Sequence, residues 1–408
     1  MPDHDRRGPL SDLRVIDLTL MLSGPFCTML LADLGADVVK IEPPHGDLTR
    51  RAGPFRDDDE LHAFGGYFHS INRNKRSVVL DLKTERGKEL LERLVAGADV
   101  LVENFRPRVM DRLGLSYEHF RERNPRLVYA SIRGFGDPRT GESPYVDWPA
   151  FDVTAQAMGG FMGITGMPDG DPTKAGPGVG DIFPAALGAV GILAAAHHAA
   201  ETGVGQYVDV AMYDGVLSLC ERIVYQYSYT GEIPRPQGNT HPILSPFDVF
   251  RTRDGWATIA APTDNHWRLL CELMGQPEAA GDERFENNYV RARNSDAVRE
   301  LVGDWTATLT NEELLVAIGG RVPVAPVNAV DDIFADEHAR VREMLVSVEQ
   351  PGSAEPVTLA GSAIKLTETP GGIYRRGPLL GEHTDEVLAE LGLAEAELCE
   401  LRETGVVK

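Results

Sequence analysis

The sequence predicts an α/β protein that combines a Rossmann-like, parallel-sheet large domain with a smaller α+β domain. Strand-like and helix-like segments alternate over residues 1–135, and a hairpin followed by helices occupies residues 247–319. Strands separated by helices form right-handed βαβ units, which produce a mostly parallel sheet. A chain of 408 residues exceeds the size at which a single core stops growing, so two domains are expected.

The first part of the chain is expected to contain five strands. Ligands of an open α/β sheet bind at the carboxyl ends of its strands. The glycine fingerprint GxGxxG is absent after the first strand, where the sequence reads Leu22-Ser23-Gly24-Pro25-Phe26. Its absence disfavours a nicotinamide or flavin enzyme. The predicted strands are Leu13–Thr19, Asp37–Glu42, Ser77–Leu82, Asp99–Asn104 and Leu127–Ile132, with helices at Pro25–Leu34 and Thr84–Ala96.

The pattern changes after about Tyr225. Phe247–Thr252 and Trp256–Ala261 flank Arg253-Asp254-Gly255, which is a strong hairpin signal. Helical patterns follow at 264–274, 295–309 and 311–319. We therefore predict that residues 1–225 form the N-terminal part of the large domain, residues 226–325 the small domain, and residues 326–408 a return to the large domain.

The returning segment is predicted to add one helix from Asp332 and two short strands, at Leu345–Glu349 and Val357–Leu359. A final helix is expected to begin at Thr384, whose hydroxyl suits an N-cap.

Composition excludes several classes of function. The net charge of −22 argues against nucleic acid and anionic membranes as partners. The four cysteines form no CxxC pair, so neither a metal site nor a disulfide framework is predicted, and the expected location is cytoplasmic. The N-terminus has no apolar signal core, and the apolar run Ile182–Ala196 is too short to span a bilayer. That run is predicted to be a buried, closely packed helix.

Gly176-Pro177-Gly178-Val179-Gly180-Asp181 places one carboxylate at a glycine-rich turn, just before a helix expected from about Phe183 to Glu201. Glycine allows a ligand to approach the backbone, and the unpaired N–H groups of a helix start favour an anion. An ionised Asp181 beside spare backbone donors suits a carboxylate nucleophile with an oxyanion site. The alternative is that Asp181 serves only as an N-cap.

Taken together, short motifs along nearly the whole chain resemble those of the class III CoA-transferases, which act on formyl-CoA, carnitine and succinyl-CoA substrates. The motifs, in order and at matching spacing, are Val15-Ile16-Asp17-Leu18, Leu34–Glu42, Asn72–Ser77, Val102–Phe105, Phe151–Ala157, Gly180-Asp181, Gly203–Gln206, Met212–Gly215 and Leu380–Thr384.

The resemblance implies an acyl-CoA donor, a carboxylic acid acceptor, no tightly bound cofactor, and an interlocked homodimer. It makes Asp181 the catalytic residue, which forms an acyl anhydride and then an aspartyl-CoA thioester. A carboxylate that is already ionised at neutral pH would need no general base.

The resemblance also implies CoA contacts at the positions that follow the predicted strands. Among them, Lys75, Arg76, Lys83, Arg106 and Arg112 are candidates for pairing with the nucleotide phosphates; the alternative for each is a solvated surface charge. The full set is Leu22, Ser23, Pro43, Lys75, Arg76, Leu80, Asp81, Leu82, Lys83, Asn104, Phe105, Arg106, Arg112, Pro149, Ala150, Phe151 and Asp152.

Departures from the family pattern narrow the reaction. Leu22 and Ala52 stand where the formyl-CoA:oxalate branch has glutamine and tryptophan, which suggests a roomier acceptor pocket for a C4 or C5 dicarboxylate. Phe151 stands where the related racemases carry a histidine, and phenylalanine cannot exchange a proton.

Two alternatives to CoA transfer remain: an acyl-CoA racemase and a non-catalytic CoA-thioester binding protein. The roles of His241, Glu382 and His383, as site residues or as structural ones, stay open at this point.

Overall fold

The computed structural model describes residues 8–408. Its internal contacts divide the chain into two compact units. The first unit contains the residues up to Phe161 together with Ala175–Tyr225 and Glu337–Lys408, and the second contains Met162–Lys174 and Gln226–Asp336. The first unit is therefore built from segments far apart in the sequence.

A six-stranded sheet forms the centre of the first unit, and every neighbouring pair of its strands is parallel. The strand order is β3-β2-β1-β4-β5-β6, a doubly wound arrangement in which the winding reverses between β1 and β4. The predicted fold class is thus confirmed, although the sixth strand was not predicted. The strands are β1 Arg14–Asp17, β2 Asp37–Glu42, β3 Arg76–Val79, β4 Val100–Glu103, β5 Val128–Arg133 and β6 Tyr207–Ala211.

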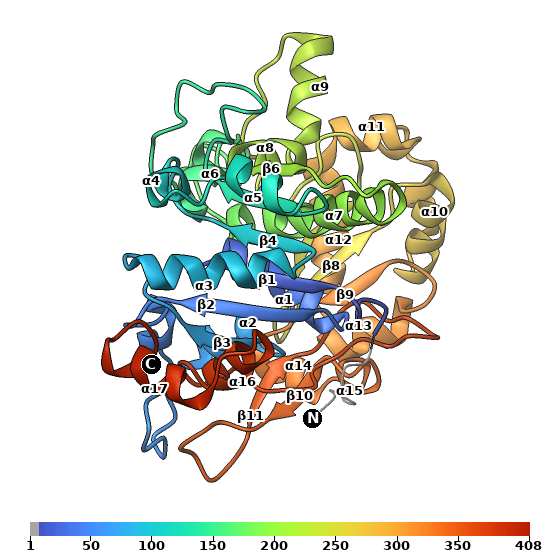
Figure 1. The fold of residues 1–408 in the computed structure, drawn as a ribbon. Helices are drawn as coiled ribbons and strands as arrows, with labels where there is room; N and C mark the ends of the chain where they lie inside the picture. Colours follow the sequence, from blue (N-terminus) through green and yellow to red (C-terminus); the bar gives the residue numbers. More distant parts are fainter. Residues whose placement is uncertain (1–7) are drawn as a thin grey trace. The chain divides into compact units, whose positions relative to one another are not determined.

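Helices cover both faces of this sheet (Figure 1). On one face, α3 (Glu85–Ala96) and α5 (Tyr117–Arg123) share an apolar core with the sheet and with the C-terminal helices α16 (Thr384–Glu390) and α17 (Glu395–Glu403). On the other face, α1 (Ser23–Asp33) packs against α7, which also contacts β5 and β6. Sequence patterns had predicted one C-terminal helix where the structure has two.

The outer edge of β3 is covered by the segment Gly381–Thr384. The backbone N–H of His383 donates to the Ser77 carbonyl at 2.9 Å, and the Val79 N–H donates to the Thr384 hydroxyl at 3.2 Å. An unpaired strand edge invites pairing with other chains, so this segment protects it. The predicted N-cap role of Thr384 is wrong: His383 occupies that position, and the Thr384 hydroxyl is engaged by β3 instead.

Helix α7 spans Val179–Thr202 and begins four residues before the predicted start at Phe183. Several of its small residues, including Gly188 and Ala189, are buried, whereas Leu187 and Val190 are exposed. Among residues 8–408 it is the one helix long and apolar enough, by length and composition, to cross a membrane, which corrects the length expected from the run Ile182–Ala196. The core helix of a soluble protein can be equally long and apolar. In this structure α7 contacts α1, α8 (Met212–Leu219), β5 and β6.

The second unit has a three-stranded antiparallel sheet, β7-β8-β9, formed by Phe247–Arg251, Trp256–Ala260 and Val324–Pro326. The predicted hairpin is the pair β7–β8. Trp267, Leu270 and Val302 are fully or almost fully buried in the core that joins this sheet to its helices. Those helices are α10 Asp264–Leu273, α11 Asn288–Arg293, α12 Ser295–Thr306 and α13 Asn311–Ile318.

Shorter elements complete the chain. The first unit also holds an antiparallel pair, β10 Leu345–Val348 with β11 Val357–Ala360, close to the predicted strands. The remaining helices are α2 Gly66–Asn72, α4 Val109–Leu113, α6 Asp152–Met158, α9 Glu221–Thr230, α14 Val330–Ala335 and α15 Glu337–Val341, with 3₁₀ turns at Leu48–Arg51, Pro277–Gly281 and Glu283–Phe285.

Candidate active site

A cavity of about 280 Å³ opens at the point where the sheet reverses its winding. Its walls come from the loops that follow β1 and β4, and Asp181 of α7 lies among the lining residues. Ligands of doubly wound sheets bind in this crevice, outside the carboxyl ends of the strands. The lining comprises Leu20, Met21, Leu22, Ser23, Tyr67, Asn104, Phe105, Arg106, Pro107, Ile132, Arg133, Gly134, Val146, Trp148, Pro149, Ala150, Phe151, Asp181 and Met212.

The loop after β1 is held by hydrogen bonds to polar side chains. The Asn104 side chain accepts from the Leu20 N–H at 2.9 Å and donates to the Leu20 carbonyl at 2.7 Å. The Lys40 ammonium is fully buried and donates to the Thr19 carbonyl at 2.7 Å and to Asp47 at 3.2 Å. These bonds stabilise a left-handed backbone at Met21, with φ of 69°, which is uncommon outside glycine. Asn104 therefore shapes the cavity wall in addition to lining it.

Asp181 is the third residue of α7 and does not cap it. The N-cap is Gly178, and the carboxylate of Asp152, at the start of α6, accepts from the Gly180 N–H at 2.8 Å. A Cβ at position 180 would lie 2.5 Å from the Asp152 carbonyl oxygen, so glycine is required for this close approach. Because Asp152 supplies the capping acceptor, α7 extends back through Gly180, and the Asp181 carboxyl group is left to line the cavity.

The expectation that Asp181 is ionised at neutral pH needs correction. Burial, together with repulsion from the Asp152 carboxylate, raises the pKa of Asp181 to about 7. A hydrogen bond from the Asp152 backbone N–H lowers this pKa, but by less. The Tyr67 ring also lines the cavity, and its pKa is raised by burial and by the neighbouring charge of Asp181. A carboxyl group with a pKa near 7 in a cleft is a typical signature of a reactive site.

The expectation of spare backbone donors at the start of α7 is also corrected. The Gly180 N–H donates to Asp152, and those of Val179, Asp181 and Ile182 donate to carbonyls of the preceding turn. The first-turn N–H groups therefore already have acceptors. An oxyanion that forms in this cavity has to find its donors elsewhere.

The predicted CoA contacts fall into two groups. Those that line the Asp181 cavity are Leu22, Ser23, Asn104, Phe105, Arg106, Pro149, Ala150 and Phe151. Those outside its lining are Pro43, Lys75, Arg76, Leu80, Asp81, Leu82, Lys83, Arg112 and Asp152.

Two of the predicted phosphate partners are already engaged. Lys75 is fully buried, and its ammonium contacts Asp17 at 3.0 Å. Arg76 is buried and forms an ion pair with Asp37 at 2.7 Å. Arg106, by contrast, is exposed at the cavity.

The residues whose roles were open in the sequence do not line this cavity. Glu382 and His383 line a second cavity of the first unit, described below. His241 belongs to the second unit, where its ring packs beside Phe247 with centroids 5.3 Å apart. Phe151, which replaces the racemase histidine, is exposed and carries no exchangeable proton at the cavity.

Sequence reasoning missed several lining residues. Tyr67 follows no predicted strand, and Trp148 lies in an irregular segment where it packs against Tyr145 with centroids 4.8 Å apart. Arg133 ends β5 and pairs with the buried Glu103 and with Asp137. The position of Arg133 at a strand's carboxyl end was a usable signal, whereas Tyr67 and Trp148 are brought in only by tertiary packing.

Comparison with known proteins agrees with this geometry. The profile of CoA-transferase family III matches residues 10–384. A succinyl-CoA:mesaconate CoA-transferase of Haloarcula hispanica is 56% identical over 389 residues, which is 95% of this chain and 97% of the relative. A succinate–glutarate CoA-transferase of Agrobacterium fabrum is 40% identical over 96% of this chain and 98% of its own.

A crystal structure of a CAIB/BAIF family protein from Brucella suis superposes with a TM-score of 0.83. It shares 37% identity, and the match covers 94% of this chain and 100% of that one. The sheet has a cavity at its reversal point, and Asp181, whose pKa is raised, lines that cavity. The chain belongs to CoA-transferase family III, and it is a CoA-transferase that uses CoA thioesters as substrates.

Proposed function

We propose that Asp181 is the nucleophile of this CoA-transferase. Its carboxylate attacks the thioester carbonyl of the donor, so that an acyl anhydride forms and CoA leaves as the thiolate. The thiolate then attacks the aspartyl carbonyl, which forms an aspartyl-CoA thioester and releases the donor acid. The single observation that carries this assignment is a carboxyl group with a raised pKa, aimed into the crevice of a doubly wound sheet.

The second half of the reaction reverses these steps. An acceptor carboxylate attacks the aspartyl thioester, which forms a second anhydride and expels the CoA thiolate. The thiolate attacks the acceptor's carbonyl, so that the new thioester leaves and Asp181 is regenerated. Because the energy of one thioester passes to the other, the sequence of steps needs no metal or nucleotide.

We assign succinyl-CoA as the donor and a C4 or C5 dicarboxylate as the acceptor. Relatives at 56% and 40% identity are named for succinyl-CoA with mesaconate and for succinate with glutarate. Leu22 lines the cavity, and an apolar side chain at that point suits an acceptor longer than oxalate. Within the cavity we retain Arg106 as the partner of a CoA phosphate and Asn104 and Phe105 as further contacts.

The proposal includes a cytoplasmic homodimer. Within the second unit, α14 has no buried residue, and its Val330 and Phe334 are 69% and 56% exposed. Within the first unit, Val190 of α7 is 64% exposed. Exposed apolar helical faces of this kind support the interlocked homodimer that the family resemblance implies, in which a partner subunit would cover them.

One experiment tests the reaction. Purified protein is incubated with succinyl-CoA and a set of carboxylic acids, including mesaconate, glutarate and oxalate, and new CoA esters are read by mass spectrometry. We expect transfer to the C5 acids, and we expect Asp181→Asn to lose it while the variant stays folded, with a melting temperature no lower than that of the wild type. Transfer by Asp181→Asn at a rate near that of the wild type would refute the nucleophile, and transfer to oxalate alone would refute the acceptor class.

A further inference from the structure

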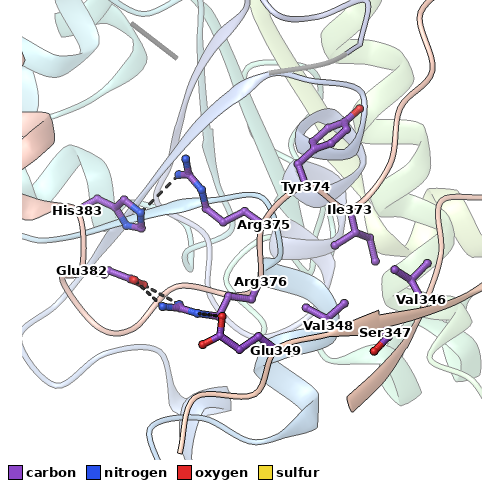
Figure 2. A pocket seen from close by; sticks show the side chains of 10 residues that line it. All are labelled: Val346, Ser347, Val348, Glu349, Ile373, Tyr374, Arg375, Arg376, Glu382 and His383. Atoms are coloured by element: carbon purple, nitrogen blue, oxygen red, sulfur yellow. Dashed lines mark hydrogen bonds and ion pairs between the residues drawn. The ribbon is translucent and has the colours of Figure 1, made fainter. Parts of the chain in front are cut away.

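A second cavity of the first unit has no part in the CoA-transfer chemistry described above. Its volume is about 510 Å³, and it shares no lining residue with the Asp181 cavity. One wall is β10, from Val346 to Val348, and another is the segment Ile373–Arg376 (Figure 2). The turn that carries Glu382 and His383 completes it.

The two neighbouring arginines of this cavity differ in their partners. Arg376 forms two bonds to the Glu382 carboxylate, at 2.8 and 2.7 Å, and lies 3.9 Å from Glu349. Arg375 has no carboxylate within ion-pair distance among residues 8–408, while its backbone N–H is fixed by the Asn74 side chain at 2.9 Å. The Arg375 guanidinium therefore has no direct carboxylate partner among these residues, and it extends from a fixed backbone.

The His383 ring presents a second donor beside Arg375. The Ser77 backbone N–H donates to Nδ1 of His383 at 3.3 Å, so the neutral ring carries its hydrogen on Nε2. Burial, reinforced by the charge of Arg375, lowers the pKa of His383, which keeps the ring neutral. Nε2 lies 3.5 Å from a guanidinium nitrogen of Arg375, and Figure 2 shows the two side chains pointing toward one another.

These two nitrogens are both donors, so they do not satisfy each other. Donors that converge without an acceptor between them need an oxygen from a third group. An anionic oxygen meets both requirements, because it accepts from two donors and neutralises the guanidinium. Val346, Val348 and Ile373 supply apolar surface in the same cavity, so the ligand can carry a short apolar part.

We propose that this cavity is a binding site for a small anion with carboxylate or phosphoryl oxygens, held by Arg375 and by Nε2–H of His383. The site is separate from the Asp181 cavity, and the inference does not depend on the mechanism of CoA transfer. Arg376 has a positioning role, since its bonds to Glu382 hold the turn that carries His383.

The test is isothermal titration of the whole protein, saturated with CoA, against inorganic phosphate and against succinate. The variants are Arg375→Gln, which removes the charge, and Arg375→Lys, which keeps it without the planar fork. Arg342→Gln is the matched control, because Arg342 is exposed on the same unit and outside the cavity. We expect binding of at least one probe by the wild type and by Arg342→Gln, a loss of about tenfold or more in Arg375→Gln, and an intermediate affinity in Arg375→Lys.

The two probes separate the sources of the anion: preference for phosphate indicates a phosphoryl ligand, and preference for succinate a carboxylate. Equal binding by the wild type and Arg375→Gln, or an equal loss in Arg342→Gln, would overturn the proposal. If Arg375→Gln has an altered melting temperature, wild-type crystals soaked in the bound probe decide instead. Density within about 3 Å of both Arg375 and Nε2 of His383 supports the site, and its absence refutes it.

Discussion

The pH dependence of the reaction is the sharpest consequence of the Asp181 environment. In the proposed reaction the ionised carboxylate of Asp181 is the nucleophile, and burial together with the Asp152 carboxylate raises the pKa of Asp181 to about 7. Activity is therefore present above this pKa and is lost as the pH falls through it. With a pKa of about 7, the ionised fraction falls about tenfold between pH 8 and pH 6.

The perturbation that isolates the cause is Asp152→Asn. Its amide oxygen can still accept from the Gly180 N–H, which Asp152 now engages at 2.8 Å, while the repulsive charge is removed. The pKa of Asp181 should then fall, so that the acid limb moves to lower pH and the variant keeps more of its activity at pH 6 than the wild type. The measured quantity is kcat/KM for the acyl-CoA donor, because it reports the ionisation of the free enzyme.

The matched control is Asp147→Asn, which removes a carboxylate from the same unit at an exposed position outside the cavity lining. Its profile should overlay that of the wild type. A wild-type profile that stays flat from pH 8 to pH 5, or an acid limb that Asp152→Asn leaves in place, would refute the assignment of the reactive group.

Further predictions follow from the same site. Because the folded-state pKa of Asp181 is raised from 3.8 to about 7, its contribution to stability is present below pH 3.8 and is lost as the pH rises through 7. As the pH rises from 4 to 8, the free energy of unfolding of Asp181→Asn, measured in urea, should therefore increase relative to that of the wild type. The increase is at most about 4 kcal/mol, and it is smaller where solvent screens the charge. A difference between the two proteins that does not change with pH would contradict the prediction. Because Phe151 replaces a histidine, a 2-methylacyl-CoA in deuterated water should take up no deuterium at its α-carbon, and uptake that depends on Asp152 would revive the racemase alternative. Arg106→Ala should weaken CoA binding by about 1.5–3 kcal/mol, and the loss should be smaller in high salt. Arg112 lies outside the cavity, so Arg112→Ala should bind CoA as the wild type does. Equal CoA affinities of the two variants in calorimetry would remove Arg106 as a phosphate partner.

Local patterns predicted much of the first unit because its strands are buried on both faces. Asp37–Glu42 was predicted with the bounds that the structure has, and every residue of that strand is buried. β6 was missed because most of its residues are only partly buried, so its apolar pattern is weak. The start of α7 was placed too late because its capping acceptor, Asp152, is 28 residues from Gly180.

The sequence by itself determined the succession of strands and helices, the family resemblance, and the choice of Asp181 as the candidate nucleophile, since these depend on local periodicity and on motif spacing. Only the tertiary structure decided the chemical state of each charged group. In the sequence, nothing distinguishes Lys75 and Arg76 from cations at the protein surface. In the structure both are buried and form ion pairs, Lys75 with Asp17 and Arg76 with Asp37. The pKa of Asp181 depends in the same way on burial and on Asp152, and the meeting of Arg375 with His383 depends on the turn that covers β3. Burial and long-range Coulomb interactions are set by distances in space, which no spacing along the chain specifies.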